Sequence, residues 1–103
     1  MDLNGRTVVI TGAGRGLGRA LALRAGRLGA QVFVAARSVE AAQKVVGEVA
    51  EDSGASACAF ACDLAEPASI PAFAQEIAGR TDRVDVLVSN GARYLGPRAL
   101  GCR

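Results

Sequence analysis

The stretch TGAGRGLG at residues 11–18 constrains the fold more than any other part of this 103-residue chain, because every second residue from its second position is glycine. It follows the β-branched run VVI at residues 8–10, which favours a strand buried on both faces. It leads into residues 17–28, where apolar residues recur at helical spacing. A glycine-rich turn between such a strand and a helix N-terminus points free N–H groups at one place. The stretch therefore predicts a site for a phosphate group.

The rest of the chain alternates strands and helices. Patterns typical of strands occupy residues 31–36, 56–61 and 83–90. One helical pattern follows Ser38, which can cap it, and ends at Gly54, and another begins near Ser69, which places Pro71 in its first turn. This order predicts right-handed crossovers and a parallel sheet with helices on both faces. We expect an α/β fold with a doubly wound sheet in the spatial order 3-2-1-4. The helix faces expected to be apolar contain Leu17, Ala20, Leu21, Ala25 and Leu28 in the first helix, Ala42, Val45, Val46 and Val49 in the second, and Ile70, Phe73, Ala74 and Ile77 in the third.

Composition excludes several classes of function. The net charge of +2 and the hydrophobic content of 50% describe a globular chain, and its arginines are scattered rather than gathered into a stripe for nucleic acid. The chain contains no histidine, which excludes Ser-His-Asp and Cys-His catalysis and most zinc sites. Cys58 and Cys62 are interpreted as small core residues, so we expect no metal. No stretch has the length of a membrane span or the pattern of a signal peptide, and we expect a cytoplasmic protein.

The glycine spacing separates subfamilies of the doubly wound fold. The pattern G-x-G-x-x-G is not matched, because position 17 is leucine and position 19 is arginine, and no Gly-Lys-Ser/Thr of a P-loop is present. The pattern Thr11-Gly12-x-x-x-Gly16-x-Gly18 resembles the cofactor loop of the short-chain dehydrogenases/reductases. The resemblance implies a Rossmann-type half domain for the dinucleotide at residues 1–92 and an irregular tail at residues 93–103.

Two further segments resemble this family. Asp63 follows the third predicted strand, as does the family's acidic residue near the adenine, although a turn or capping role is the alternative interpretation. LVSNGA at residues 87–92 resembles the family's Leu-Val-Asn-Asn-Ala-Gly, but Ser89 replaces the first asparagine and the last two residues are reversed. The cofactor-binding residues that the resemblance and the chemistry predict are Thr11, Gly12, Arg15, Gly16, Leu17, Gly18, Arg37, Ser38, Asp63, Leu64, Asn90, Gly91 and Ala92.

The end of the second predicted strand indicates which dinucleotide is bound. An enzyme that prefers NAD places an acid there to receive the ribose hydroxyls, whereas residues 35–38 here are Ala-Ala-Arg-Ser. The guanidinium of Arg37, with Arg15 from the glycine loop, is suited to a 2′-phosphate. We therefore expect NADP(H) rather than NAD(H). The alternative is that both are ordinary solvated arginines.

The chain lacks the family's catalytic signature. In the family, hydride transfer relies on a serine and on Tyr-x-x-x-Lys, whereas the nearest pattern here is YLGPR at residues 94–98, with Gly96 and Pro97 opposing a helix. We expect no catalytic residue in this chain and no turnover by the chain alone. The leading hypothesis is the nucleotide-binding portion of an oxidoreductase for a carbonyl or alcohol substrate. The alternatives are a non-catalytic NADP(H)-binding module and an assembly fragment that binds no cofactor, and self-association through an exposed sheet edge is expected.

Overall fold

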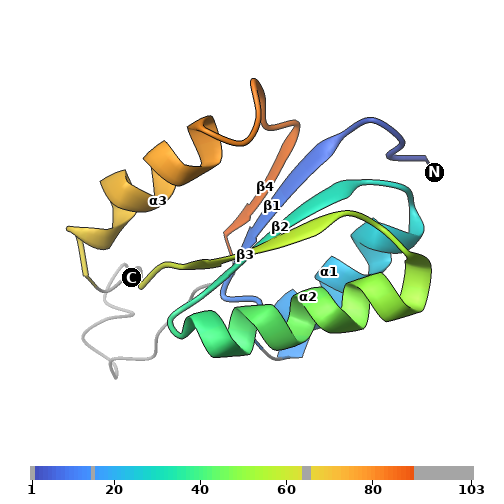
Figure 1. Cartoon of the computed structure of the whole chain (residues 1–103), viewed down its shortest axis with the longest axis horizontal. Coiled ribbons are helices and arrows are strands. Elements are labelled where there is room, and N and C mark those ends of the chain that lie inside the picture. Colours follow the sequence, from blue (N-terminus) through green and yellow to red (C-terminus); the bar gives the residue numbers. More distant parts are fainter. Residues whose placement is uncertain (1, 15, 64–65, 90–103) are drawn as a thin grey trace, which may run out of the picture.

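The structure is a computed structural model that describes residues 2–14, 16–63 and 66–89 (Figure 1). Strands and helices alternate along it, as the sequence predicts. The predicted site residues Arg15, Leu64, Asn90, Gly91 and Ala92 and the predicted tail lie outside the described residues. The elements are β1 (Thr7–Thr11), α1 (Gly16–Arg27), β2 (Gln31–Ala36), α2 (Val39–Ser53), β3 (Ala57–Ala61), α3 (Ser69–Ala78) and β4 (Val86–Ser89).

The strands form one parallel sheet in the order β3-β2-β1-β4, which confirms the predicted order. β1 lies in the interior, with Val9 opposite Phe33 of β2 and opposite Leu87 of β4. All pairings are parallel, so the carboxyl ends of the four strands meet at the same edge of the sheet. The loops that leave this edge are therefore brought together in space, although their sequences are far apart.

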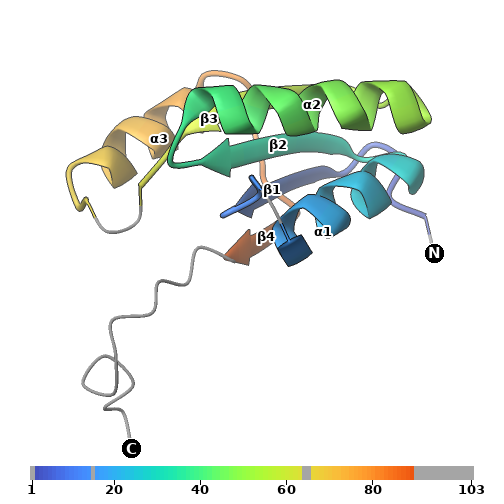
Figure 2. The ribbon, with the colours of Figure 1, turned by 90° about the horizontal axis from the view of Figure 1, so that it is seen from below.

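Helices cover both faces of the sheet. α1 and α2 lie side by side on one face of the sheet and α3 lies on the other (Figure 1 and Figure 2). The first face buries Ile10, Val32 and Val34 of the strands against the helices. The second buries a smaller cluster in which the Phe60 ring lies 5.5 Å from Phe33 and 5.7 Å from Phe73, measured between ring centroids. Each fully buried side chain of this size contributes about 1.5–3 kcal/mol to folding.

The buried face of α1 matches the predicted one only in part: Ala25 is buried and Leu21 packs against the core as expected. Leu17, expected on the apolar face, is 64% exposed, and Ala20 is also exposed. The residues of α1 that are buried are Gly18, Ala22, Ala25 and Gly26. A Cβ at Gly26 would lie 2.8 Å from the Ser53 Oγ and 2.9 Å from the Val49 Cγ1. The contact of α1 with α2 at this position therefore leaves no room for a side chain.

Most of the predicted helix ends are confirmed. The Oγ of Ser38 accepts a hydrogen bond of 3.1 Å from the Ala41 N–H and caps α2, and Gly54 ends that helix in the left-handed conformation, with a φ of 72°. Pro71 lies in the first turn of α3, as expected. In α3, Phe73 and Ile77 are buried, whereas Ile70 and Ala74 are exposed, contrary to the expectation.

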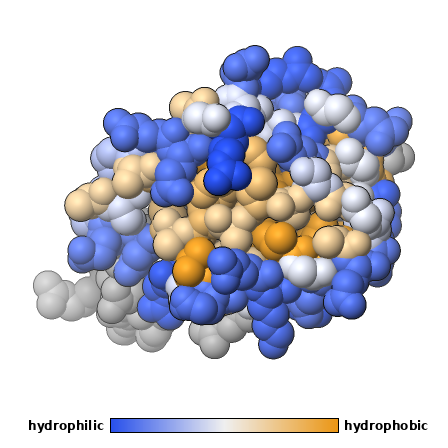
Figure 3. Space-filling view, in the orientation of Figure 1, coloured by the Kyte–Doolittle hydropathy of each residue, from blue (hydrophilic) through white to orange (hydrophobic). Residues whose placement is uncertain are grey.

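The sheet has two edges in the described part of the chain, formed by β3 and β4. Figure 3 shows apolar side chains gathered between α3 and α2, where β3 runs. At the other edge, Leu87 of β4 is 64% exposed, and Val84 and Val86 are exposed as well. No helix in the described ranges is both long enough and apolar enough to cross a membrane.

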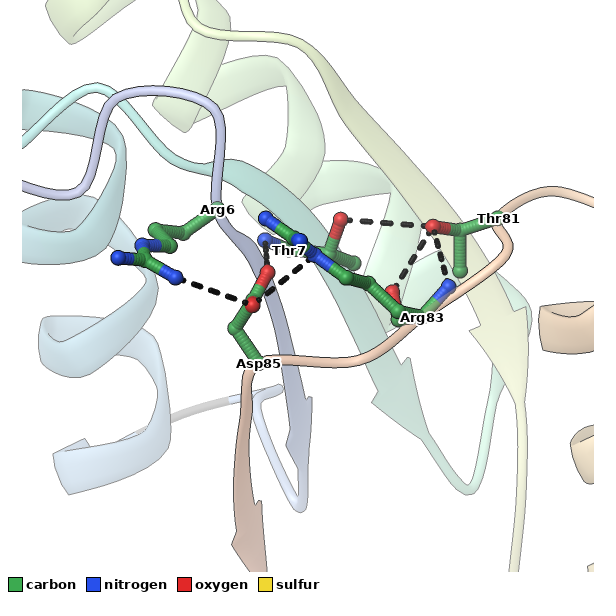
Figure 4. Close-up of polar contacts among 5 residues, drawn as sticks. All are labelled: Arg6, Thr7, Thr81, Arg83 and Asp85. Atoms are coloured by element: carbon green, nitrogen blue, oxygen red, sulfur yellow. Dashed lines mark hydrogen bonds and ion pairs between the residues drawn. The ribbon is translucent and has the colours of Figure 1, made fainter.

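A carboxylate fixes β4 to β1 at the amino edge of the sheet, away from the loops of the carboxyl edge (Figure 4). Asp85 accepts a hydrogen bond of 2.8 Å from the backbone N–H of Thr7, and it pairs with Arg83 at 3.1 Å and Arg6 at 3.5 Å. The Thr7 N–H bond, followed by the charges of the two arginines, lowers the pKa of Asp85. The Oγ1 of Thr81 lies 3.5 Å from that of Thr7 and adds a second link to β1.

We predict that Asp85→Asn destabilises the chain at neutral pH and that the difference from wild type narrows in acid. Because the folded-state pKa of Asp85 is lowered, its stabilisation is complete above the unfolded value of about 3.9 and is lost as the pH falls through the folded value. Urea unfolding from pH 7 to pH 3 measures this difference. Asp82→Asn, at an exposed neighbour, is the control and should show no such pH dependence. A difference for Asp85→Asn that is constant with pH would contradict the assignment.

Candidate functional site at the carboxyl edge of the sheet

The turn from β1 into α1 takes the shape that its glycines predict. Gly12 and Gly16 have φ values of 65° and 62°, in the left-handed region that side chains disfavour. α1 begins at Gly16 with no acidic residue in its first turn, so the positive end of the helix dipole is not neutralised there. The turn can therefore receive an anion on backbone N–H groups at the start of α1.

Gly14 adds a second constraint to this turn. A Cβ at Gly14 would lie 3.3 Å from the Cβ of Ala41 and 3.5 Å from that of Ala36. Ala36 ends β2 and Ala41 lies in the first turn of α2. The glycine loop thus packs directly against the segment that joins β2 to α2, and a larger residue would force the two apart.

Backbone hydrogen bonds connect the ends of three strands at this edge. The N–H of Ala13 donates to the carbonyl of Ala35 at 3.0 Å, and the N–H of Cys62 donates to the carbonyl of Ala36 at 2.8 Å. The last two carbonyls of β2 are therefore held from both sides, by the chain after β1 and by the chain after β3. Arg37 follows immediately, so its backbone leaves the sheet from a fixed point.

Arg37 differs from most described arginines in having no ion-pair partner among the described residues. Arg19 pairs with Glu48 at 2.7 Å and Arg27 with Asp52 at 2.6 Å, both between α1 and α2. These hydrogen bonds lower the pKa of the Glu48 and Asp52 carboxyl groups. Arg80 has a different contact, because its guanidinium lies over the Phe60 ring. Arg24, on α1, and Arg80 are the other described arginines without an ion pair. The guanidinium of Arg37 can therefore serve a ligand without breaking an ion pair with a described residue.

The remaining described candidates take different places. Thr11 is buried, and its Oγ1 donates to the Val88 carbonyl at 3.4 Å, so this side chain links β1 to β4 inside the sheet. Asp63 follows β3 and is half-buried, with its backbone bonded to Ser69. Leu17 is exposed at the start of α1, next to the glycine turn. The described residues contain no cluster of side chains that could hold a metal ion.

Two contributors to this edge were not predicted from the sequence. Gly14 belongs to the glycine-rich stretch, but the pattern Thr11-Gly12-x-x-x-Gly16-x-Gly18 does not specify this position, and in the structure Gly14 packs against α2. Ser69 was expected only as the approximate start of a helix, and its bonds to Asp63 depend on how the intervening chain turns. The glycine repeat could have indicated Gly14, whereas no local pattern indicates the role of Ser69.

A parallel sheet with a glycine-rich turn at its carboxyl edge is the architecture of Rossmann-type dinucleotide-binding proteins. Residues 6–99 match the family model described as short chain dehydrogenase. The chain is 40% identical to sorbitol dehydrogenase of Cereibacter sphaeroides over 94 residues, which cover 91% of this chain and 35% of that protein. The chain belongs to the short-chain dehydrogenase family, which confirms the resemblance seen in the sequence.

Solved structures support the same assignment. A metagenomic short-chain oxidoreductase in complex with NADP is 42% identical, with a TM-score of 0.77, over 82% of this chain and 38% of that one. The Pseudomonas aeruginosa RhlG/NADP complex is 31% identical, with a TM-score of 0.80, over 86% of this chain and 35% of that one. The family uses NAD(P), and this chain corresponds to the N-terminal, cofactor-binding portion of its members. It spans about a third of the length of the relatives that it matches.

We predict that Gly14→Val lowers the affinity of the chain for its dinucleotide by about tenfold or more, equivalent to about 1.4 kcal/mol. The added side chain meets Ala41 and Ala36 and displaces the glycine loop from the start of α2. Titration followed by cofactor fluorescence measures the dissociation constant. Gly47→Val is the control, because a Cβ on this exposed glycine of α2 meets nothing within 4 Å. Wild-type affinity in Gly14→Val would show that the loop does not need this close contact.

Proposed function

We propose that this chain binds NADP(H) as the cofactor-binding half, residues 1–92, of an oxidoreductase that acts on a carbonyl or alcohol substrate. The observation that carries the preference for NADP(H) is the exposed Arg37 at the end of β2, with no ion-pair partner among the described residues and no acid at residues 35–38. A carboxylate there would repel a 2′-phosphate, whereas a guanidinium can bind one through two parallel hydrogen bonds. Arg15, by its place in the sequence, is proposed to contact the same phosphate.

The other proposed contacts follow the order of the loops along the sheet edge. The pyrophosphate is proposed to lie on the N–H groups of the turn from Gly12 to Gly18, where the positive φ of Gly12 and Gly16 supports the required shape. Ser38 caps α2 with its oxygen as the acceptor, and its hydroxyl can donate to a ligand at the same time. Asp63 and Leu64 are proposed on the adenine side, and Asn90, Gly91 and Ala92 beyond the end of β4.

The chemistry of the proposed reaction belongs to the nicotinamide, which supplies or accepts a hydride when bound. This chain's own contribution is to hold and orient the dinucleotide, and we propose no catalytic residue in it and no turnover by the chain alone. The reaction would take place in the cytoplasm. The alternatives are a non-catalytic NADP(H)-binding module and an assembly fragment that binds no cofactor. The titration below separates these two alternatives from each other, and an NADPH-dependent activity assay separates the leading proposal from both.

We also propose that the chain associates with itself through β4. In the described part of the chain this strand is hydrogen-bonded on one side only, to β1, and Leu87 beside that edge is 64% exposed. A strand with one free edge and an apolar neighbour is a template for pairing with a second strand. The alternative function, an assembly fragment that binds no cofactor, depends on the same exposed edge of β4.

We predict that wild type binds NADPH about tenfold to a hundredfold more tightly than NADH, and that Arg37→Asp abolishes this preference. The range corresponds to a charge-assisted hydrogen bond of about 1.5–3 kcal/mol. Isothermal titration of both dinucleotides against both proteins measures the ratio. Arg24→Asp makes the same charge change at an arginine of α1 that also has no described ion pair, so it should leave the ratio intact. Equal affinities in wild type would overturn the preference for NADP(H).

We predict that Leu87→Lys lowers the fraction of associated chains in sedimentation velocity, because a charge beside the β4 edge opposes a second strand. Leu17→Lys is the matched control, since Leu17 is also 64% exposed but lies on α1. It should leave the association unchanged. A wild-type chain that sediments as a monomer up to about 100 μM would rule out the proposed association, since even a weak complex with a Kd near that value would be half-formed there.

A further inference from the structure

Ser69 makes an unusual set of bonds for the first residue of a helix. Its Oγ accepts a hydrogen bond of 3.1 Å from the N–H of Asp63, and lies 2.7 Å from the carbonyl of Asp63 and 3.0 Å from that of Glu66, to which its hydroxyl donates. The carbonyl of Asp63 also accepts from the Glu66 N–H at 2.9 Å. One hydroxyl therefore bonds both polar groups of the Asp63 backbone.

These bonds do not serve the helix. A serine stabilises a helix when it stands one residue before the first turn and accepts from N–H groups further along. That position in α3 is Ala68, which has a helical backbone and makes no side-chain cap. Ser69 instead bonds backwards, to the chain between β3 and α3. The start of α3 is left without a side-chain cap, and the hydroxyl holds Asp63.

The position of Asp63 is fixed from its other side as well. The N–H of the preceding residue, Cys62, donates to the carbonyl of Ala36, the residue before Arg37. The Cys62 bond and the Ser69 hydroxyl therefore hold the Asp63 backbone beside the end of β2, at the edge where the glycine loop also lies. The reach of the Asp63 carboxyl group depends on this anchoring.

We propose that Ser69 is a positioning residue for base selection: it holds Asp63 where the carboxylate can accept a hydrogen bond from the exocyclic amino group of adenine. This inference rests on the proposed function, in which Asp63 lies on the adenine side of a bound dinucleotide. A carboxylate only accepts hydrogen bonds, so it favours the 6-amino group of adenine over the 6-carbonyl of hypoxanthine. Loss of the Ser69 hydroxyl loosens Asp63, and the choice between the two bases weakens.

The test compares NADPH with its hypoxanthine analogue, in which a carbonyl oxygen replaces the amino group. Wild type should bind NADPH about tenfold or more tightly than the analogue, as expected for a hydrogen bond to a charged group. Ser69→Ala should lower this ratio by about threefold or more, and Ser69→Thr, which keeps a hydroxyl, should retain it within about twofold. Dissociation constants for both dinucleotides come from fluorescence titration, with circular dichroism to verify folding.

Ser53→Ala provides a matched control at the other end of the molecule. The Oγ of Ser53 also donates to a backbone carbonyl, that of Val49, and accepts from a backbone N–H, that of Ala55. Its loss should leave the ratio between the two dinucleotides unchanged, even where it lowers stability. A ratio that falls in Ser69→Ala and not in Ser53→Ala therefore separates positioning from a general loss of structure.

Each other outcome overturns a defined part of the inference. An unchanged ratio in Ser69→Ala, or an equal loss of affinity for both dinucleotides, shows that Ser69 is only structural. Equal binding of both dinucleotides by wild type removes the contact between Asp63 and adenine, and the role of Ser69 with it, but leaves NADP(H) binding in place. A wild-type chain that binds neither dinucleotide overturns the proposed function itself.

Discussion

The last two carbonyls of β2 are the acceptors on which the arrangement of the site depends. The N–H groups of Ala13 and Cys62 donate to them from opposite sides, so the chains leaving β1 and β3 are both bonded to the end of β2. In a parallel sheet the loops at the carboxyl edge belong to separate crossover units, and nothing local in the sequence connects them. These two backbone hydrogen bonds join otherwise independent loops into one candidate site.

Small residues set how closely α1 and the loop before it approach α2. Gly26 allows α1 to contact Ser53 and Val49 of α2, and Gly14 allows the loop before α1 to contact Ala41. A residue with a side chain cannot make these contacts without displacing its neighbours. The helices are held together at their surfaces by Arg19 with Glu48 and Arg27 with Asp52, pairs that are largely solvated and individually weak. The close contact at Gly26 therefore depends on packing rather than on these ion pairs.

The sequence predicted the features that have a local cause. β-branched runs predicted β1 and β2, Ser38 and Gly54 predicted the ends of α2, and the alternation of elements predicted the sheet order. It predicted the buried face of α1 only in part, because hydrophobic periodicity identifies leucine as core and cannot register that a glycine is needed for close approach. It also did not predict the bonds of Ser69 to Asp63, which depend on the tertiary path of the chain after β3.

The two edges of the sheet carry different kinds of chemistry. Asp85, with Arg6, Arg83 and the Thr7 N–H, satisfies its charge within the chain at the amino edge, whereas Arg37 at the carboxyl edge has no such internal partner among the described residues. In the proposed function, the residue that sets ligand preference is therefore separate from the residues that hold the fold together. Under that proposal, a substitution in this single loop exchanges one preferred ribose substituent for another, while the charges that hold β4 to β1 stay unchanged.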